Sequence, residues 1–244
     1  LESRGLLNGD SQLVVQQAAS GKLERVQSIF DSGKLIAWHG YEQRQEGPSG
    51  GDIAKTSILR PIVRDSVAHI GSSLAWHGAL SFDYFFDERQ QVAWFIDCNP
   101  RLVEPMNAFF SGINLPDILV RLSLTEKTTG LASGREGVRT HMTLMALLDA
   151  AARGGRIGLL RRLVRAFLDR DVFRNSREEL TPLRLDPATV FPLVITLAFL
   201  LANPGSSAAM ASYSVRSYSL SREAAKAIIG PLQCGDREER PNTR

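Results

Sequence analysis

The sequence predicts an α+β protein whose strands and helices are segregated along the chain. Short β-rich segments separated by turn-forming residues fill the first half, together with one amphipathic helix. From residue 141 onward the chain is rich in Ala, Leu and Arg. The helices expected there cover residues 141–153, 157–170, 188–202 and 221–229. A polar Gly/Ser/Thr-rich segment at 125–137 lies between the halves, so we expect an antiparallel sheet with helices in residues 1–126 and an all-α accessory domain with a loose C-terminal tail in residues 127–244.

The composition is that of an ordinary globular protein. Of the 244 residues, 43% are hydrophobic and 23% are charged, which excludes a disordered or fibrous chain. Lys and Arg number 29 against 26 Asp and Glu, a net charge of +3 that does not indicate a nucleic-acid partner. Cys98 and Cys234 lie far apart, which argues against a disulfide scaffold or zinc finger and favours a reducing, cytoplasmic location. Because the chain opens at Leu1 without a leader, we expect it to belong to a longer protein.

The first half contains three expected strands, a helix and a hairpin. The strands cover residues 13–17, 25–30 and 34–41. A helix with apolar residues at steps of three and four begins near Leu59 and ends near His77. Two further strands, 79–87 and 92–99, enclose a polar turn and predict a hairpin, and a short helix follows at 116–124.

The hairpin brings acidic side chains together. Side chains alternate between the faces of a strand, so Asp97 and Asn99 are expected to point the same way, together with Ala93 and Phe95. If the turn is centred near Gln90, Asp83 on the preceding strand lies opposite Asp97. Two carboxylates and an amide oxygen suit hard cations such as Mg²⁺. The competing interpretation is that residues 97–100 form only a strand-ending turn, because Asn and Pro favour turns.

Three residues outside the hairpin are candidates for contacts with a substrate. His77 precedes a glycine where the helix meets the first hairpin strand, and its alternative role is to cap that helix. Glu104 and Asn107 follow the hairpin, and the segment that contains them is the other candidate for contact with a substrate. The alternative for this segment is a helix N-terminus with a favourably placed acid.

The second half contains two apolar or basic features. The run 190–202 is too short to span a bilayer as a helix, and we expect a buried core helix. Residues 153–177 are rich in arginine, with an apolar stripe formed by Ile157, Leu160, Val164, Phe167 and Leu168. We expect this stripe to pack in the core and the arginines to be solvated, because acidic residues are interleaved with them. The alternative is a membrane-facing surface.

The segment Phe95-Ile96-Asp97-Cys98-Asn99-Pro100-Arg101, followed by Ser111-Gly112-Ile113-Asn114-Leu115-Pro116, resembles a signature of ATP-grasp enzymes. It is most similar to the large chain of carbamoyl phosphate synthetase and to biotin carboxylase. The segment 13–21 resembles the strand that lines the adenine pocket in that family. The resemblance covers roughly residues 13–124.

The resemblance implies roles for several residues. Asp83 and Asp97 would hold two Mg²⁺ (or Mn²⁺) ions, Asn99 would hold one of them, and Arg101 would stabilise the transferred phosphoryl group. ATP would bind near the start of the chain. Its adenine would contact Gln16, Gln17 and Ala19, and its ribose would contact Glu24.

The sequence departs from the family pattern in three ways. Asp97 stands where the family usually has Glu, and Gln16 stands where a Glu is common. The phosphate-binding lysines and the glycine-rich flap of the family lie upstream of the adenine strand, where this chain has only about a dozen residues. We therefore expect an N-terminal lobe of the same protein to complete the site, and the isolated chain to bind ATP poorly.

The function implied by the resemblance is that of an ATP- and Mg²⁺-dependent ligase. A carboxylate or bicarbonate would be activated as an acyl phosphate and then attacked by an amine or another nucleophile. Two alternatives are a catalytically inactive nucleotide-binding regulatory module and a membrane-peripheral adaptor. A membrane partner is the less favoured expectation, and the sequence identifies neither the acceptor nor the oligomeric state.

Overall fold

The structure is a computed structural model that describes residues 17–47, 50–126, 130–181, 183 and 186–210. The strands are β1 (Lys22–Asp31), β2 (Lys34–Glu46), β3 (Asp52–Ile58), β4 (Gly78–Asp87), β5 (Val92–Asn99), β6 (Ala132–Ser133), β7 (Arg139–His141) and β8 (Ser176–Glu178). The α-helices are α1 (Pro61–Ser73), α2 (Met106–Phe110), α3 (Leu115–Ser123), α4 (Thr143–Phe167) and α5 (Val190–Ala202). Gln16, most of the strand expected at 13–17, the helix expected at 221–229 and the C-terminal tail lie outside the described residues.

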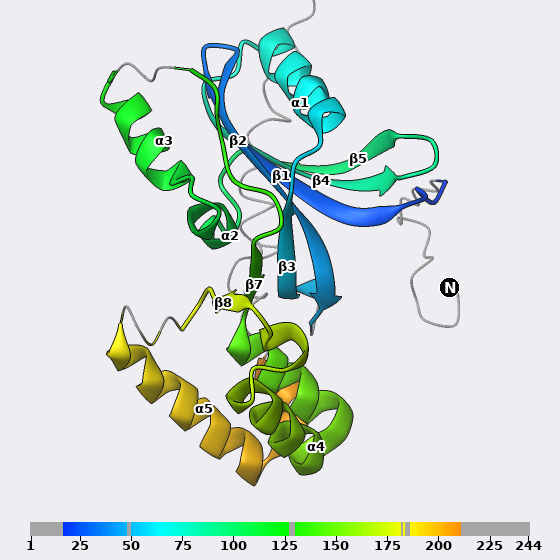
Figure 1. Ribbon diagram of the computed structural model, residues 1–244, viewed down its shortest axis with the longest axis vertical. Coiled ribbons are helices and arrows are strands. Elements are labelled where there is room, and N and C mark those ends of the chain that lie inside the picture. Colours follow the sequence, from blue (N-terminus) through cyan, green and yellow to red (C-terminus); the bar gives the residue numbers. More distant parts are fainter. Residues whose placement is uncertain (1–16, 48–49, 127–129, 182, 184–185, 211–244) are drawn as a thin grey trace, which may run out of the picture. The chain divides into compact units, whose positions relative to one another are not determined.

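The strands form one mixed, mostly antiparallel sheet, which confirms the predicted fold class (Figure 1). Its order is β5-β4-β1-β2-β3-β7-β8, and β6 also pairs with β2. The pairs β2/β6 and β7/β8 are parallel, whereas β1/β2, β1/β4, β4/β5 and β3/β7 are antiparallel. Five elements that are short or lie next to glycines were not predicted from the sequence: β3, β6, β7, β8 and α2.

The chain divides into two compact units. Unit 1 contains residues 1–45, 54–141 and 175–179, and unit 2 contains residues 46–53, 142–174 and 180–244. Within the expected linker, β6 pairs with β2, and β7, which begins two residues beyond the linker, pairs with β3.

Unit 1 buries apolar side chains on both faces of its sheet. On one face, aromatic and aliphatic residues of β1, β2 and β4 pack with Val63 and Val67 of α1. The contact is close at Gly71 of α1, where a Cβ would overlap the ring of Phe30. On the other face, Ile29 and Ala37 pack with residues of α2 and α3. Further along that second face lie the polar side chains Arg25, Gln27 and Asp83.

The hairpin contains a β-bulge that the alternation pattern did not predict. Asp83 pairs with Asp97 whereas Tyr84 pairs with Phe95, so Ile96 is an extra residue in β5. The bulge rotates the strand, and Phe95 therefore lies on the core face, with its ring centroid 5.4 Å from that of Phe82. The prediction that Ala93 and Phe95 share a face with Asp97 is wrong, because both pack against the core. Asp97 remains opposite Asp83.

Unit 2 is helical at its centre, and α4 bends at Gly155, whose φ is 55°. Its core consists of leucines from α4 and α5, with Leu147, Leu159 and Leu200 fully buried. The predicted burial of the apolar run is wrong, because Leu200 is the only residue of α5 in the buried class. The predicted packing of the stripe on α4 is also wrong, because Phe167 is 91% exposed and Ile157, Leu160, Val164 and Leu168 are exposed as well.

Among the described residues, no individual helix has the length and apolar character needed to cross a membrane. The segments Pro187–Ala202 and Pro204–Met210 reach that length and composition only when taken together, and they are bent by 117° at their junction.

Candidate functional site

The centre of the candidate site is a pair of carboxylates on neighbouring strands. Asp83 on β4 lies directly opposite Asp97 on β5, and Asn99 lies opposite Ser81. The Asn99 amide donates a hydrogen bond to Asp97 Oδ2 at 2.9 Å. Asp97 is exposed, and the side chain of Asp83 is 26% exposed. The structure therefore brings the three expected oxygen donors to one accessible face of the sheet.

Basic and aromatic side chains continue this row across the sheet. Arg25 on β1 lies between Asp83 and Tyr41 in register, and its Nε is 3.3 Å from Asp83 Oδ1. The Arg25 guanidinium lies 5.9 Å from the centre of the Tyr41 ring, and Lys55 Nζ on β3 lies 5.1 Å from the same centre. We call the five residues Asp97, Asp83, Arg25, Tyr41 and Lys55 the charged row.

Lys55 is the member of the charged row that the sequence analysis missed. Its side chain is 1% exposed, and its Nζ contacts Glu104 and lies 2.9 Å from Glu179 Oε2. Burial raises the pKa of Glu179, although the Lys55 ammonium opposes that rise. The sequence feature that could have indicated this residue is a single lysine within the β-rich segment 52–58. It was not recognised as a site residue because β3 itself was not predicted.

The segment after β5 is tied to the same face of the sheet. Ser81 Oγ donates to the Arg101 carbonyl at 2.6 Å, and Gln27 Oε1 accepts from the Val103 backbone at 3.0 Å. Arg101 itself is exposed, two residues after Asn99. Glu104 adopts a positive φ of 52°, and its side chain remains 42% exposed while contacting Lys55. This segment therefore links the acid pair to the buried lysine.

Asn107 has a structural position that conflicts with contact to a substrate. It is fully buried, its Oδ1 lies 2.7 Å from His39 Nε2, and its Nδ2 donates to Thr140 Oγ1 at 2.7 Å. Both ends of its amide are thus used to join α2 to β2 and β7. The expectation that Asn107 contacts a substrate is therefore wrong, and its role is to hold these elements together.

His39 is expected to make the stability of the protein depend on pH. Burial lowers its pKa from 6.5 to about 4, and the nearby Lys55 adds to the shift. In the unfolded chain His39 therefore binds a proton near pH 6.5, whereas in the folded chain it is protonated only near pH 4. The free energy of unfolding should fall by about 3 kcal/mol as the pH drops through this window.

Urea unfolding at stepped pH measures this effect. Other carboxylates titrate in the same range, so the relevant quantity is the difference between the unmodified chain and His39→Gln, which keeps a donor for Asn107. Identical pH profiles for the two proteins would show that His39 does not carry the effect.

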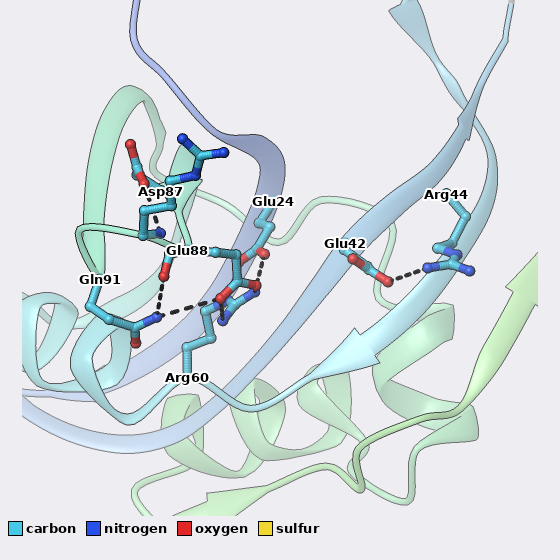
Figure 2. A network of polar contacts seen from close by, with 8 residues as sticks. Glu24, Glu42, Arg44, Arg60, Asp87, Glu88 and Gln91 are labelled. Atoms are coloured by element: carbon cyan, nitrogen blue, oxygen red, sulfur yellow. Dashed lines mark hydrogen bonds and ion pairs between the residues drawn. The ribbon is translucent and has the colours of Figure 1, made fainter.

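Glu24 lies on the opposite side of the sheet from the charged row. It pairs with Tyr84, and it is fully buried. Arg60 binds it through two hydrogen bonds of 2.6 Å and also reaches Glu88, as Figure 2 shows. Burial alone would lower the pKa of Arg60, but the hydrogen bonds to the two glutamates outweigh it and raise it. Glu24 is therefore an anchor for α1, and the structure does not bring it to the face that would hold a ribose.

The remaining predicted residues lie at the ends of the hairpin strands. Gln17 and Ala19 precede β1, where Ser20 Oγ donates to Asp87 Oδ2 at 2.7 Å. That contact places them beside the turn end of β4, a few residues from Asp83. His77 lies at the other end of β4, where its Nδ1 accepts from the Ser32 backbone at 3.3 Å. The structure does not bring His77 to the acid pair.

Within the described part of the chain, no three His, Cys, Asp or Glu side chains are arranged to hold a metal ion. The hairpin supplies two carboxylates and one amide instead. Such a set fits Mg²⁺ only where further oxygen ligands come from water or from a phosphate group, which is the usual way that Mg²⁺ is bound.

Comparisons with known proteins found similarity to solved structures, whereas no family model and no curated protein sequence matches the chain. The matching solved structures include biotin carboxylases. The biotin carboxylase domain of 2-oxoglutarate carboxylase from Hydrogenobacter thermophilus, crystallised with MgADP and bicarbonate, has 16% identity and a TM-score of 0.39 over 48% of this chain and 28% of that one. A biotin carboxylase–βγ-ATP complex from Campylobacter jejuni has 22% identity and a TM-score of 0.35 over 44% of this chain and 26% of that one.

A third structure, the urea carboxylase of Kluyveromyces lactis, has 16% identity and a TM-score of 0.39 over 48% of this chain and 11% of that one. The chain thus spans little more than a quarter of the length of the carboxylase domains that it matches.

Proposed function

We propose that this chain carries the metal- and phosphate-binding part of an ATP- and Mg²⁺-dependent ligase that activates a carboxylate or bicarbonate as an acyl phosphate. The observation that carries the proposal is the register of the hairpin. It places Asp83 opposite Asp97, with Asn99 on the same open face and Arg101 two residues beyond.

The donor set supports magnesium as the metal. Asp83, Asp97 and Asn99 would hold it, and the phosphates of ATP would complete its coordination. Bound there, the ion would neutralise the charge that develops on the phosphates. Asp97 is already oriented by the Asn99 amide, so its carboxylate has little freedom to lose on binding. Mn²⁺ prefers the same oxygen ligands and is expected to substitute.

Arginine side chains would act on the phosphoryl group itself. Phosphoryl transfer depends mainly on positioning and charge stabilisation, for which a guanidinium is well suited. Arg101 is exposed two residues beyond Asn99, and Arg25 Nε lies 3.3 Å from Asp83 Oδ1. A substrate carboxylate oxygen would attack the γ-phosphorus, the bond to the bridging oxygen of ADP would break, and a nucleophile would then displace phosphate from the acyl phosphate.

Glu104 is the proposed edge of the acceptor pocket. It is partly exposed and contacts the buried Lys55, so it borders both solvent and the charged row. Glu24 and Asn107 are left out because both are buried in other contacts. Gln16, Gln17 and Ala19 would edge the adenine, and another lobe of the same protein would supply the groups that cover the phosphates.

The test is ADP formation by the longest natural form of the protein that contains this chain. With MgATP and a panel of carboxylates and bicarbonate, with and without amines, we expect turnover that requires both the metal and one acceptor. Removing divalent cations with EDTA should abolish it, and Mn²⁺ should restore it. Nucleotide binding without turnover for every acceptor would favour the regulatory-module alternative instead.

A further inference from the structure

The outer face of α5 in unit 2 is entirely apolar. The helix has no charged residue along Val190–Ala202, and its inner side packs Leu193, Leu197 and Leu200 against α4. Phe191 and Ile195 on the outer side are each 68% exposed, and Val194 and Phe199 are exposed as well. The outer face of a surface helix is ordinarily polar, and a continuous exposed apolar face marks a surface that meets another apolar phase.

Helix α4 extends this apolar surface beyond its contact with α5. At 3.6 residues per turn, the exposed side chains Ile157, Leu160, Val164 and Phe167 fall within a sector of about 80°. Leu159 and Leu163, which pack in the core shared with α5, lie on one flank of this sector. The exposed apolar sector of α4 therefore adjoins α5. We call the exposed apolar residues of α4 and α5 together the apolar patch.

Arginines lie on the other flank of the same sector. Arg161 and Arg165 follow it around the helix, and with Arg153 and Arg162 they line a pocket of about 220 Å³ at the bend of α4. Asp149 pairs with Arg153, and Asp171 pairs with both Arg162 and Arg165. Four arginines thus face two aspartates, and Arg161 makes no ion pair within the described part of the chain. The pocket is left with an excess of positive charge.

We propose that unit 2 binds the surface of an anionic phospholipid bilayer. The apolar patch would enter the boundary between headgroups and acyl chains, and the arginine pocket would hold lipid phosphates. An apolar face bordered by arginines is the pattern of helices that lie in the plane of a membrane. Each basic residue near an anionic surface strengthens binding about fivefold.

Charge argues against a second copy of the chain as the occupant of this patch. A twofold dimer brings the same surface of both subunits together. The arginine pocket borders the patch, so such a dimer would place two positive pockets close to one another, which disfavours association. An anionic bilayer instead offers negative phosphates beside hydrocarbon, which matches both parts of the surface.

The test is co-sedimentation of the full chain with vesicles. Vesicles of phosphatidylcholine and phosphatidylserine in equal amounts should bind the chain at least about tenfold more tightly than phosphatidylcholine alone, and added salt should weaken the binding. The double variant Phe191→Ser/Ile195→Ser should lose at least about tenfold in affinity. Arg161→Glu reverses one charge and should lose about thirtyfold.

Matched controls come from unit 1. Val120→Ser removes an apolar side chain that is 57% exposed on α3, and Arg89→Glu reverses an exposed charge in the hairpin turn. Both should bind vesicles like the unmodified chain. Circular dichroism spectra and melting temperatures establish that each variant is folded.

Several results would overturn the proposal. They are the absence of sedimentation with anionic vesicles, equal binding to both vesicle types, and equal losses in the unit 1 controls. Analytical ultracentrifugation without lipid provides a separate check. A dimer of the unmodified chain that Phe191→Ser/Ile195→Ser converts to a monomer would assign the patch to a second copy and likewise refute membrane binding.

Discussion

Replacing Asp97 by alanine is expected to reduce ATP turnover about a thousandfold while leaving the fold intact. Metal-held charge at the phosphates is worth several kcal/mol in phosphoryl transfer, and each 1.36 kcal/mol corresponds to tenfold in rate. The side chain is exposed on β5, an edge strand of the sheet, where it accepts a hydrogen bond from Asn99. Its loss should therefore change the free energy of unfolding by less than about 1 kcal/mol.

Asn99→Ala should also reduce ATP turnover. Asn99 both orients Asp97 and is a proposed metal ligand, so its removal weakens the site in two ways. Titrating MgCl₂ against activity separates these variants from a general defect, because a lost metal ligand raises the Mg²⁺ concentration needed for half-maximal turnover.

Two neighbouring substitutions serve as controls. Cys98→Ser changes the exposed residue between the two proposed ligands, which pairs with Phe82 on the other face of the hairpin. Asp87→Asn removes an acid from the end of β4, where it binds Ser20 and the turn amides. Both should retain turnover within about threefold, since Cys98 lies on the other face of the hairpin and Asp87 lies four residues from Asp83, at the turn end of β4. Full turnover in Asp97→Ala and Asn99→Ala would remove the metal assignment.

The strong local signals in the sequence predicted the fold well. The hairpin has apolar alternation on β4 and a polar turn, and both of its strands were found to within a residue. Helix α1 was found from its apolar spacing, but it ends at Ser73, because the backbone leaves the helix at Leu74 and reaches a positive φ at Ala75. The short strands β6, β7 and β8 are defined by pairing with distant segments, which no local pattern reports.

The site was predictable only in part, for a similar reason. The turn pairs Asp87 with Val92, and without a bulge this register would place Asp83 opposite Ile96. The extra residue Ile96 brings Asp97 opposite Asp83 instead. It also lets Phe95 pack against Phe82 and Tyr84, which alternation cannot anticipate. The roles of Glu24 and Asn107 depend on partners 36 and 68 residues away, Arg60 and His39, and sequence spacing does not reveal such partners.

The exposure of α5 shows that even a strong local signal in the sequence does not determine burial. An apolar run of 13 residues predicts burial when a core is available to receive it. Unit 2 offers α5 a partner on one side only, so half of the helix remains at the surface. Hydrophobicity predicted that α5 would meet an apolar phase, but it did not reveal which one.

Lys55→Met is expected to lower the free energy of unfolding by about 3–5 kcal/mol. The methionine fills a similar volume, but it leaves the Glu179 carboxylate buried without the ammonium that lies 2.9 Å from it. Glu104 loses its contact as well, although its exposed side chain can turn to water. Glu104→Gln should therefore cost less than about 1 kcal/mol, which makes it the matched control.

The pH dependence of Lys55→Met distinguishes lost charge compensation from lost packing. Burial raises the pKa of Glu179, and removing Lys55 removes the neighbour that opposes this rise. A carboxyl group whose pKa is raised on folding favours the folded state at low pH and loses that contribution as the pH rises through its folded pKa. The deficit of Lys55→Met in urea unfolding should therefore shrink as the pH falls toward the normal range of a glutamate, whereas a packing defect would be independent of pH.

The double variant Lys55→Met/Glu179→Leu completes the cycle. Replacing a buried ion pair by apolar side chains is often close to neutral, so we expect it to unfold within about 1–2 kcal/mol of the unmodified chain and to be more stable than Lys55→Met alone. The loss in free energy of unfolding of the double variant could instead equal the sum of the losses of Lys55→Met and Glu179→Leu. That result would mean that Lys55 and Glu179 act independently. Lys55 would then be removed from the charged row, because its charge would have no effect on the site.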